Sequence, residues 1–430
     1  MIIVDRELER REAEGRPVRV GLVGAGYMGR GVARQVVERV PGMQLAGIVN
    51  RTLEKAESAY RAAGVDGIAQ VETPAALEEA VSAEVPAVSE DFRALTRAGP
   101  VDVVIEATGH VEHGAQVALD AIEHGKHVVL MNAELDATVG PALKARADRA
   151  GVVLTNTDGD QPGVVMNLLR FVRTIGYRPL LAGNIKGLLD PYRTPSTQET
   201  FAKRHGQDVK MITSFADGTK LAMEMAVVAN ATGLGVARTG MHGPACQHVD
   251  EAAGLFSAEA LLEGGGIVDY VLGAQPGPGV FVLGYDDDPA RGRYMDYFKM
   301  GPGPLHVFYV PYHLPHLEAP ISAARAALFQ DPVITPQGEP VCEVVAVAKR
   351  DLTAGEPLDG IGGFTCYGVI DNSAPCRRDG LLPMGLAEGA RLTREVPRDE
   401  PIQMDHVELP AGRSSHHLWR QQFEGICVTS

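Results

Sequence analysis

Three glycines at positions 24, 26 and 29 have the spacing of a phosphate-binding loop. They directly follow the apolar run Val18 to Val23 and open the helix-forming segment Arg30 to Val40. The first glycine allows a tight turn, the second lets the backbone approach a pyrophosphate, and the third lets helix and strand pack closely. The phosphate would lie at the helix N-terminus. The pattern therefore predicts a dinucleotide site formed by Gly24, Gly26, Tyr27, Met28 and Gly29.

The end of the next apolar run carries Asn50, Arg51 and Thr52. Enzymes that use NAD commonly place an Asp or Glu here to hold the ribose 2′-hydroxyl. The Arg51 guanidinium can instead bind a 2′-phosphate through two hydrogen bonds, with Asn50 and Thr52 as further donors. We therefore predict that the cofactor is NADP(H). The alternative is that Arg51 lies on a helix surface and the protein accepts both nicotinamide cofactors.

Two later apolar runs also end in polar residues, namely Ala107-Thr108-Gly109 and Asn132. Ligands of open parallel sheets bind at the carboxyl ends of the strands. We expect these residues to line the nicotinamide end of the cofactor site. The alternative is ordinary loop chemistry, with Thr108 capping a helix.

Lys186 ends the apolar run Leu180 to Ile185 and is the predicted catalytic acid. Burial beside another cation would lower its pKa, so that it can protonate a carbonyl oxygen as hydride arrives. The alternative is a surface lysine in a loop. Lys220 and Glu224 share one helix face at a spacing typical of a surface ion pair, and Glu224 is the second catalytic candidate.

Asp158 and Asp160 lie in the segment Thr157 to Gly163, which closes the last strand of the first domain. Two carboxylates this close suit a divalent cation or a substrate hydroxyl, and they equally suit an Asx-turn and a helix N-cap. We take Asp160 as a catalytic candidate that orients substrate or metal. A polar loop further on is predicted to bind an anionic substrate group through Arg193, Ser196 and Lys203.

Short apolar runs alternate with helical patterns over residues 1–160, which predicts an α/β fold, a doubly wound sheet of the Rossmann type. We interpret Pro74 to Gly99 as helical decoration on this domain. The predicted strands are Val18 to Val23, Gln44 to Val49, Asp102 to Ala107, His127 to Met131 and Val152 to Thr155.

Residues 161–340 predict an α+β domain for substrate binding, catalysis and oligomerisation. Its antiparallel strands are expected at residues 279–285, 294–299 and 305–310. The helix Ile321 to Phe329 is a candidate to return the chain to the nucleotide domain. Residues 341–430 predict a third domain, small and rich in β-structure.

The formal net charge of −15 over 430 residues argues against a nucleic-acid partner and favours a small-molecule substrate. Met1 to Arg6 lacks the features of a signal peptide, and no apolar run approaches the ~20 residues needed to span a bilayer. We therefore expect a cytoplasmic protein that does not bind membranes. The apolar antiparallel sheet predicted for the second domain favours a homo-oligomer. The absence of a CxxC pair indicates reduced thiols at Cys246, Cys342, Cys366, Cys376 and Cys427.

The run Val101 to Pro162, with Glu106-Ala107-Thr108-Gly109 and the phrase Gly125 to Asn132, resembles the homoserine dehydrogenase family. The phrase Lys349 to Leu358, echoed at Gly385 to Leu392, resembles the SAF domain. The whole arrangement is similar to the deoxyxylulose-phosphate-reductoisomerase-like group.

The last resemblance implies isomerisation of a phosphorylated deoxyketose followed by reduction with NADPH, assisted by Mg²⁺ or Mn²⁺, with Asp160 or Glu224 holding the metal. Our leading hypothesis is an NADPH-dependent reductase or reductoisomerase. The alternatives are a homoserine-type dehydrogenase and a non-catalytic NADP-sensing protein whose SAF module binds a sugar or a partner.

Overall fold

The computed structural model describes residues 3–424 and divides them into two compact units. Unit 1 contains the described residues of 1–160, 314–335 and 414–430, and unit 2 contains residues 161–313 and 336–413. The break after Asp160 coincides with the first predicted domain boundary. The units are nevertheless assembled from separated stretches of chain, whereas the predicted domains at 1–160, 161–340 and 341–430 are contiguous.

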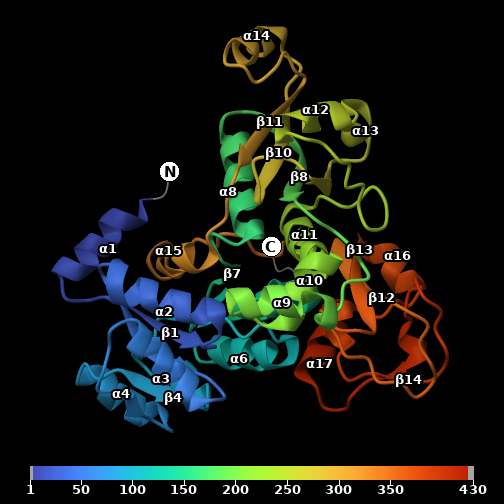
Figure 1. Ribbon diagram of the computed structural model, residues 1–430. Coiled ribbons are helices and arrows are strands. Elements are labelled where there is room, and N and C mark those ends of the chain that lie inside the picture. Colours follow the sequence, from blue (N-terminus) through green and yellow to red (C-terminus); the bar gives the residue numbers. More distant parts are fainter. Residues whose placement is uncertain (1–2, 425–430) are drawn as a thin grey trace. The chain divides into compact units, whose positions relative to one another are not determined.

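Unit 1 is built on a seven-stranded parallel sheet in the order β3-β4-β2-β1-β5-β6-β7 (Figure 1). The predicted Rossmann-type architecture is therefore confirmed. The strands are β1 (Val18–Val23), β2 (Met43–Val49), β3 (Ala69–Gln70), β4 (Ala87–Ser89), β5 (Val103–Glu106), β6 (His127–Leu130) and β7 (Leu154–Asn156). The helices are α1 (Val4–Ala13), α2 (Tyr27–Arg39), α3 (Leu53–Ala62), α4 (Pro74–Ser82), α5 (Arg93–Thr96), α6 (Val111–Glu123), α7 (Ala133–Ala150), α15 (Pro315–Phe329) and α17 (Ser414–Gln421).

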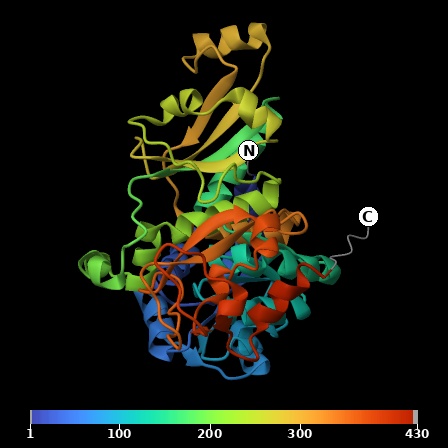
Figure 2. The same ribbon diagram turned by 90° about the vertical axis from the view of Figure 1, so that its right-hand side faces the viewer.

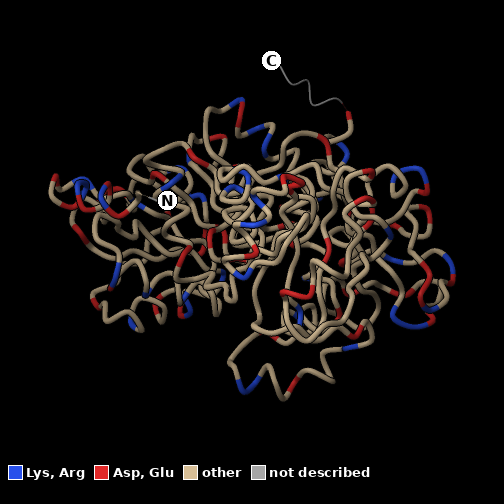
Figure 3. Tube along the Cα trace, turned by 90° about the horizontal axis from the view of Figure 1, so that it is seen from above, with Lys and Arg blue, Asp and Glu red and all other residues tan. Residues whose placement is uncertain are grey.

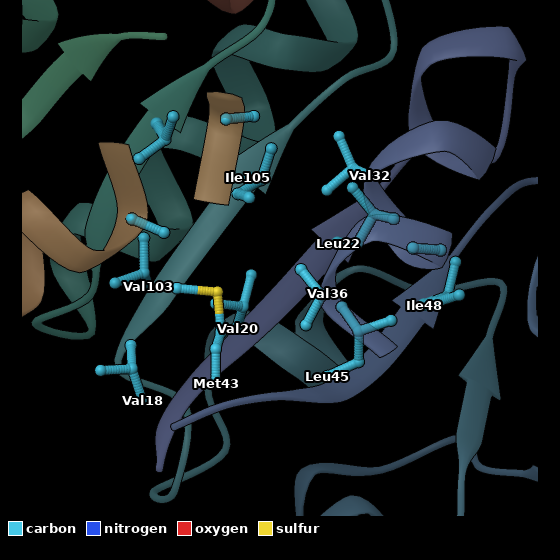
Figure 4. Close-up of a cluster of buried hydrophobic side chains, with 14 of the residues drawn as sticks. Val18, Val20, Leu22, Val32, Val36, Met43, Leu45, Ile48, Val103 and Ile105 are labelled. Atoms are coloured by element: carbon cyan, nitrogen blue, oxygen red, sulfur yellow. The ribbon is translucent and has the colours of Figure 1, made fainter. Parts of the chain in front are cut away.

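The order of strands reverses beside β1, because the chain runs from β1 to β2 on one side and returns to β5 on the other. The loops that follow β1 and β5 are therefore neighbours, which is where open α/β sheets bind ligands. Figure 4 shows the core beneath these loops, in which Val20 and Leu22 of β1 meet Val32 and Val36 of α2. Burial of this apolar layer fixes the helix against the strand that precedes the glycine-rich loop.

Helix α15 belongs to unit 1, as the helix predicted at residues 321–329 suggested, and it packs against α2. Arg325 of this helix pairs with Asp158 at 3.0 Å, and both side chains are almost fully buried. The Ser322 hydroxyl also accepts a hydrogen bond from the Asp158 backbone at 2.6 Å. These contacts fasten α15 to the segment after β7.

Unit 2 is built on a four-stranded mixed sheet in the order β11-β10-β8-β9. Its strands are β8 (Arg178–Lys186), β9 (Ile267–Leu272), β10 (Gly279–Tyr285) and β11 (Leu305–Val310). Its longer helices are α8 (Gln161–Thr174), α9 (Pro195–His205), α10 (Val209–Asp217), α11 (Thr219–Thr232) and α14 (Pro289–Tyr297). Because side chains alternate across a strand, Leu181 and Ile185 join the apolar cluster on one face, while Asn184 and Lys186 point to the other.

The C-terminal part of unit 2 is a small β-rich body, as predicted. Strands β12 (Cys342–Ala348) and β13 (Cys366–Asn372) pair in antiparallel fashion, as do β14 (Arg391–Leu392) and β15 (Val407–Glu408). Helix α11 packs against both β12 and β13 (Figure 1). The short helix α16 (Ser373–Arg378) follows β13.

Two predicted elements are wrong. The expected strand at residues 294–299 is instead the end of α14, which stands at the tip of the β10–β11 hairpin (Figures 1 and 2). Its N-cap Asp288 accepts from Ala290, and Pro289 occupies the first helical position, so local capping decides the structure. The stretch Pro74 to Gly99 contains β4 as well as helices, because three buried residues between helical patterns give no visible period.

Lys and Arg residues are interleaved with Asp and Glu along the trace, without one basic band in the described part (Figure 3). Among residues 3–424, no helix is long and apolar enough to cross a membrane. Four cysteines, Cys246, Cys342, Cys366 and Cys376, are free thiols, and Cys427 lies outside the described residues.

Replacing Arg325 by Ala is expected to lower the free energy of unfolding by about 3–5 kcal/mol, because the buried Asp158 carboxylate would lose its ion pair. Urea unfolding measures this change. The matched control is Arg34→Ala, which removes an exposed ion pair with Glu38 and should cost less than about 1 kcal/mol. Equal effects of the two substitutions would contradict the anchoring role of Arg325.

Candidate functional site

The glycine-rich loop after β1 has the geometry that a dinucleotide requires. Gly24 has a φ of +108°, and a Cβ there would lie 2.6 Å from the Ala107 carbonyl oxygen. A Cβ on Gly29 would lie 2.0 Å from the Gly24 carbonyl oxygen. Gly26 differs, because no atom lies within 4 Å of a Cβ built on it. The packing of the protein thus requires glycine at positions 24 and 29, whereas the space beside Gly26 contains no protein atoms.

The N-terminus of α2 is available for an anion. Gly26 is its N-cap and supplies no side chain to the helix, so the N–H groups of the first turn have no side-chain cap. Both Gly26 and Tyr27 are exposed, and Met28 is half-buried. An uncapped helix start beside an open glycine fits the pyrophosphate of a nicotinamide dinucleotide.

Asn50 holds this loop in place rather than facing solvent. Its Oδ1 accepts a hydrogen bond from the Ala25 backbone at 3.1 Å, and its Nδ2 donates to the Thr52 carbonyl at 3.0 Å. Arg51 and Thr52 are both exposed. The structure therefore assigns Asn50 to positioning and leaves Arg51 accessible for a 2′-phosphate.

The predicted residues after β5 and β6 converge on a carboxylate that the sequence analysis did not select. Glu106 is fully buried and accepts hydrogen bonds from the Thr108 backbone at 2.9 Å, the Thr108 hydroxyl, and Asn132 Nδ2 at 2.8 Å. Burial raises the pKa of Glu106, and these hydrogen bonds oppose the rise. The sequence feature that could have identified Glu106 is that it is the one charged residue in the otherwise apolar strand β5.

Asn132 is completely buried and also caps α7 by accepting from the Leu135 backbone at 3.1 Å. These contacts give its side chain a positioning role, and the place of Asn132 at the nicotinamide end of the site stays a prediction. Ala107, Thr108 and Gly109 are half-buried at the carboxyl edge of the sheet, and Gly109 has a φ of +70°. They remain candidates for direct contact with the cofactor.

Lys186 ends β8 in unit 2, where it is half-buried among polar groups. Burial lowers the pKa of Lys186, and the positive charge of Lys220 lowers it further, while the carboxylates of Glu224 and Asp217 act in the opposite direction. This is the environment that the sequence analysis required of a catalytic lysine. A neutral amine is therefore accessible nearer to physiological pH than in a free lysine.

Lys220 and Glu224 are not the surface pair that their spacing suggested. Lys220 and Glu224 are only 8% and 4% exposed, because α11 is buried along most of its length. Glu224 accepts a hydrogen bond from Asn184 at 3.1 Å, and Asn184 also donates to Gln161 at 2.7 Å. Asn184 and Gln161 were missed, although Asn184 stands two residues before Lys186 and so shares its face of the strand.

The two aspartates after β7 have different surroundings. Asp158 forms the buried ion pair with Arg325, so it is a structural residue of unit 1. Asp160 is buried as the last residue of that unit. Within residues 3–424, no group of three or more His, Cys, Asp or Glu side chains is arranged to hold a metal ion. The predicted Mg²⁺ or Mn²⁺ site, with Asp160 or Glu224 as ligand, stays a prediction.

The predicted anion site around Arg193 is not a single cluster of unpaired cations. Arg193 pairs with Asp190 at 3.0 Å, and Lys203 pairs with Glu199 at 2.6 Å on the exposed face of α9. Ser196 is an exposed residue in the first turn of the same helix. The sequence placed these groups in one loop, but helix formation directs Lys203 into a surface ion pair.

Three family models match successive parts of the chain. Residues 24–155 match the NAD-binding domain of homoserine dehydrogenase, residues 159–319 match the catalytic domain of oxidoreductase DRL, and residues 343–408 match the SAF domain. The first two of these parts thus match domains of NAD(P)-dependent oxidoreductases. The chain's Rossmann-type domain binds a nicotinamide cofactor, and a SAF domain lies near its C-terminus.

Comparison with curated proteins gave no match. Among solved structures, UDP-N-acetylglucosamine 3-dehydrogenase GnnA from Acidithiobacillus ferrooxidans is 17% identical, with a TM-score of 0.40, over 74% of this chain and 91% of that one. Myo-inositol dehydrogenase from Lactobacillus casei is 15% identical, with a TM-score of 0.39, over 69% and 75%.

The oxidoreductase yvaA from Bacillus subtilis is 18% identical, with a TM-score of 0.29, over 41% of this chain and 45% of that one. The match thus spans less than half the length of the Bacillus protein.

Replacing Gly26 by Ala is expected to leave the melting temperature unchanged and to weaken cofactor binding at least about tenfold. A Cβ at this position meets no protein atom, and the residue has an ordinary φ of −72°, so only the pyrophosphate would be obstructed. Calorimetry with NADPH measures the affinity. Gly254→Ala, which also points into open space, is the control. Unchanged affinity in Gly26→Ala would remove the loop from the cofactor site.

Proposed function

We propose that the protein catalyses hydride transfer between NADP(H) and a small hydroxy-carbonyl compound of sugar-like character, with Lys186 as the proton donor. The observation that carries this proposal is a lysine at the end of β8 whose pKa is lowered by burial beside a second cation. A lysine ammonium with a lowered pKa gives up its proton more readily than an ordinary lysine does, as a general acid must.

When bound, the nicotinamide supplies a hydride to the carbonyl carbon. The carbonyl oxygen gains negative charge as this bond forms, and the Lys186 ammonium donates a proton to it, which leaves a hydroxyl group and a neutral amine. The amine then regains a proton from water. In the oxidative direction, the neutral amine of Lys186 accepts the hydroxyl proton. Glu224 and Asn184 orient this region through their hydrogen bond at 3.1 Å.

The charges around Lys186 favour a substrate with an anionic group. Lys186 and Lys220 supply two positive charges, and Glu224 and Asp217 supply two negative charges, of which Asp217 is already paired with Lys349. An anion would relieve the repulsion between the two ammonium groups. The resemblance to the reductoisomerase-like group favours a phosphorylated deoxyketose, which we propose as the first substrate to test. Arg193 and Ser196 remain proposed contacts, whereas Lys203 is committed to a surface ion pair.

Two other reactions can be tested in the same experiment. Reduction without isomerisation needs only the hydride and the Lys186 proton. A homoserine-type reaction would reduce aspartate semialdehyde, whose carboxylate also suits a site with two lysines.

NADPH absorbance, followed at neutral pH with each candidate carbonyl compound, tests the reaction. Lys186→Ala is expected to lower kcat by about 100-fold or more, the usual contribution of a general acid, with the NADPH affinity unchanged. Lys210→Ala, which removes a lysine bonded to the Asp359 carbonyl outside this cluster, is the control. Oxidation only with a phosphorylated ketose supports the first substrate, and oxidation only with the semialdehyde supports the homoserine-type reaction. Normal turnover in Lys186→Ala would overturn the proposed acid.

The cofactor preference is proposed to rest on Arg51. Its guanidinium is exposed at the start of α3, and no acidic residue occupies the end of β2. Loss of a charge-assisted pair with the 2′-phosphate should cost about 1.5–3 kcal/mol, which corresponds to a roughly 10- to 100-fold higher Kd.

Arg51→Ala is therefore expected to weaken NADPH binding by that factor and to leave NADH binding nearly unchanged. Calorimetry or fluorescence titration with both cofactors measures the difference. Arg39→Ala, at another exposed arginine of unit 1, is the matched control. A parallel loss of affinity for both cofactors in Arg51→Ala would contradict the assignment.

A further inference from the structure

Lys349 follows β12 and is fully bonded inside unit 2. Its ammonium donates to Asp217 Oδ2 at 2.7 Å, to the Arg193 carbonyl at 2.7 Å and to the Gly363 carbonyl at 2.8 Å. The side chains of Lys349 and Asp217 are 3% and 0% exposed. An ammonium group has three N–H donors, so each one has an acceptor. We call residues 343–408, which match the SAF domain, the SAF segment. Lys349 of this segment thus links three separate parts of the unit.

Asp217 connects Lys349 to the start of α11. It ends α10, and Gly218, with a φ of +91°, lets the chain turn directly into α11. The other carboxylate oxygen of Asp217 accepts from the Thr219 backbone at 2.9 Å. Strand β13 holds the same turn, because the Gly368 backbone donates to the Thr219 hydroxyl at 2.8 Å. The first turn of α11 is therefore bonded on both sides.

The first two turns of α11 carry the charges that act on Lys186. Lys220 and Glu224 both influence its pKa, and so does Asp217 at the junction before the helix. Glu224 is additionally bonded to Asn184 on the strand that ends in Lys186. A displacement of this helix start would change the distances between Lys186 and all three charges. Coulomb energies at partly buried sites are sensitive to such changes.

The loop after Lys186 has a second attachment to the SAF segment. The Tyr192 hydroxyl donates to Asp399 at 2.9 Å, and the Arg398 guanidinium lies 3.9 Å from the centre of the Tyr192 ring. The next residue, Arg193, provides the carbonyl that Lys349 binds. The chain on the C-terminal side of Lys186 is thus held by Lys349, which follows β12, and by residues 398–399.

Stability alone does not account for the Lys349–Asp217 pair. Removing two charges from water is costly, and replacing a buried ion pair by apolar residues of similar size is often neutral or stabilising. The pair also sits where its geometry determines the position of charged residues rather than of an apolar core. Its arrangement is therefore better explained by the site than by the fold.

We propose that the SAF segment is an integral part of the catalytic centre, in which Lys349 is a positioning residue that holds Asp217 and the start of α11 around Lys186. The inference rests on the proposed role of Lys186. It assigns the SAF segment a part in the reaction itself, in place of a separate module that binds a sugar or a partner.

The experiment measures the ionisation of Lys186 in the intact protein without substrate. Competitive labelling of lysine amines with an amine-reactive reagent, followed over a range of pH by mass spectrometry, reports the neutral fraction at each lysine. The main variant is the double substitution Lys349→Met with Asp217→Asn, which leaves neither charge buried without a partner. Asp217 is among the charges that act on the Lys186 pKa and raises it, whereas Lys349 is not among them, so the double substitution should lower the pKa of that amine.

In the double variant, the labelling rate of Lys186 at neutral pH should therefore rise by roughly threefold to tenfold, with labelling of the exposed Lys203 unchanged. Lys349→Met alone should in addition lower the melting temperature, because the Asp217 carboxylate would be buried without its ion pair. A folded double variant with the wild-type labelling profile of Lys186 would overturn the proposal.

A second pair of variants keeps the test decisive if the double variant does not fold. Thr219→Val preserves the shape of the side chain but removes the hydroxyl that bonds β13, whereas Thr219→Ser keeps it. Thr219→Val is expected to change the labelling rate of Lys186 at neutral pH at least about threefold, and Thr219→Ser to restore the wild-type rate. Wild-type rates in both would reject the positioning role.

The labelling experiment and the turnover experiment fail independently. If Lys186→Ala retains turnover, the proposed function is lost whatever the labelling shows. If Lys186→Ala is inactive while the double variant has wild-type labelling of Lys186, only the role of the SAF segment is rejected.

Discussion

A charge that has been taken out of water must be compensated within the protein, and this constraint organises both units. In unit 1, Glu106 is buried at the carboxyl edge of the sheet, where its hydrogen bonds fix the loops after β5 and β6. In unit 2, the ammonium of Lys349 and the carboxylate of Asp217 compensate each other. An uncompensated charge at either position would cost several kcal/mol. The surrounding loops are therefore held in the arrangement that supplies the partners.

The nucleotide-binding part of the fold could be predicted because its signals are local. Gly29 is required by its contact with Gly24, five residues earlier, and Gly24 by its contact with Ala107, at the end of the neighbouring strand. The strands of a buried parallel sheet are, in addition, continuous apolar runs. The same local logic failed for the strand expected at residues 294–299. There, an alternating or β-rich run suggested a strand, but the cap at Asp288 determined a helix.

The chemistry of unit 2 could be predicted only in part, because spacing along a helix does not reveal which face is covered. Lys186 was found from its place at a strand end. Lys220 and Glu224 have the spacing of an exposed pair, yet α11 is enclosed by strands that come much later in the chain. Lys349 opens the phrase that resembles the SAF domain, but nothing in the sequence indicated its contact with Asp217, since its three acceptors come from separate segments. The substitution experiments therefore address residues that only the tertiary structure brings together.

Unit 1 combines stretches from the beginning and from the end of the chain, which has a consequence for the synthesis of the protein. Its C-terminal helix, α17, packs against α6 and α7, and Glu112 of α6 accepts hydrogen bonds from the backbones of Ser414 and Ser415. A nascent chain displays the first seven strands long before residues 414–421 leave the ribosome. The surfaces of α6 and α7 that meet α17 must remain uncovered during this interval, while all of unit 2 is being made. Such late closure of an early unit is a setting in which a growing chain depends on chaperones to avoid premature association.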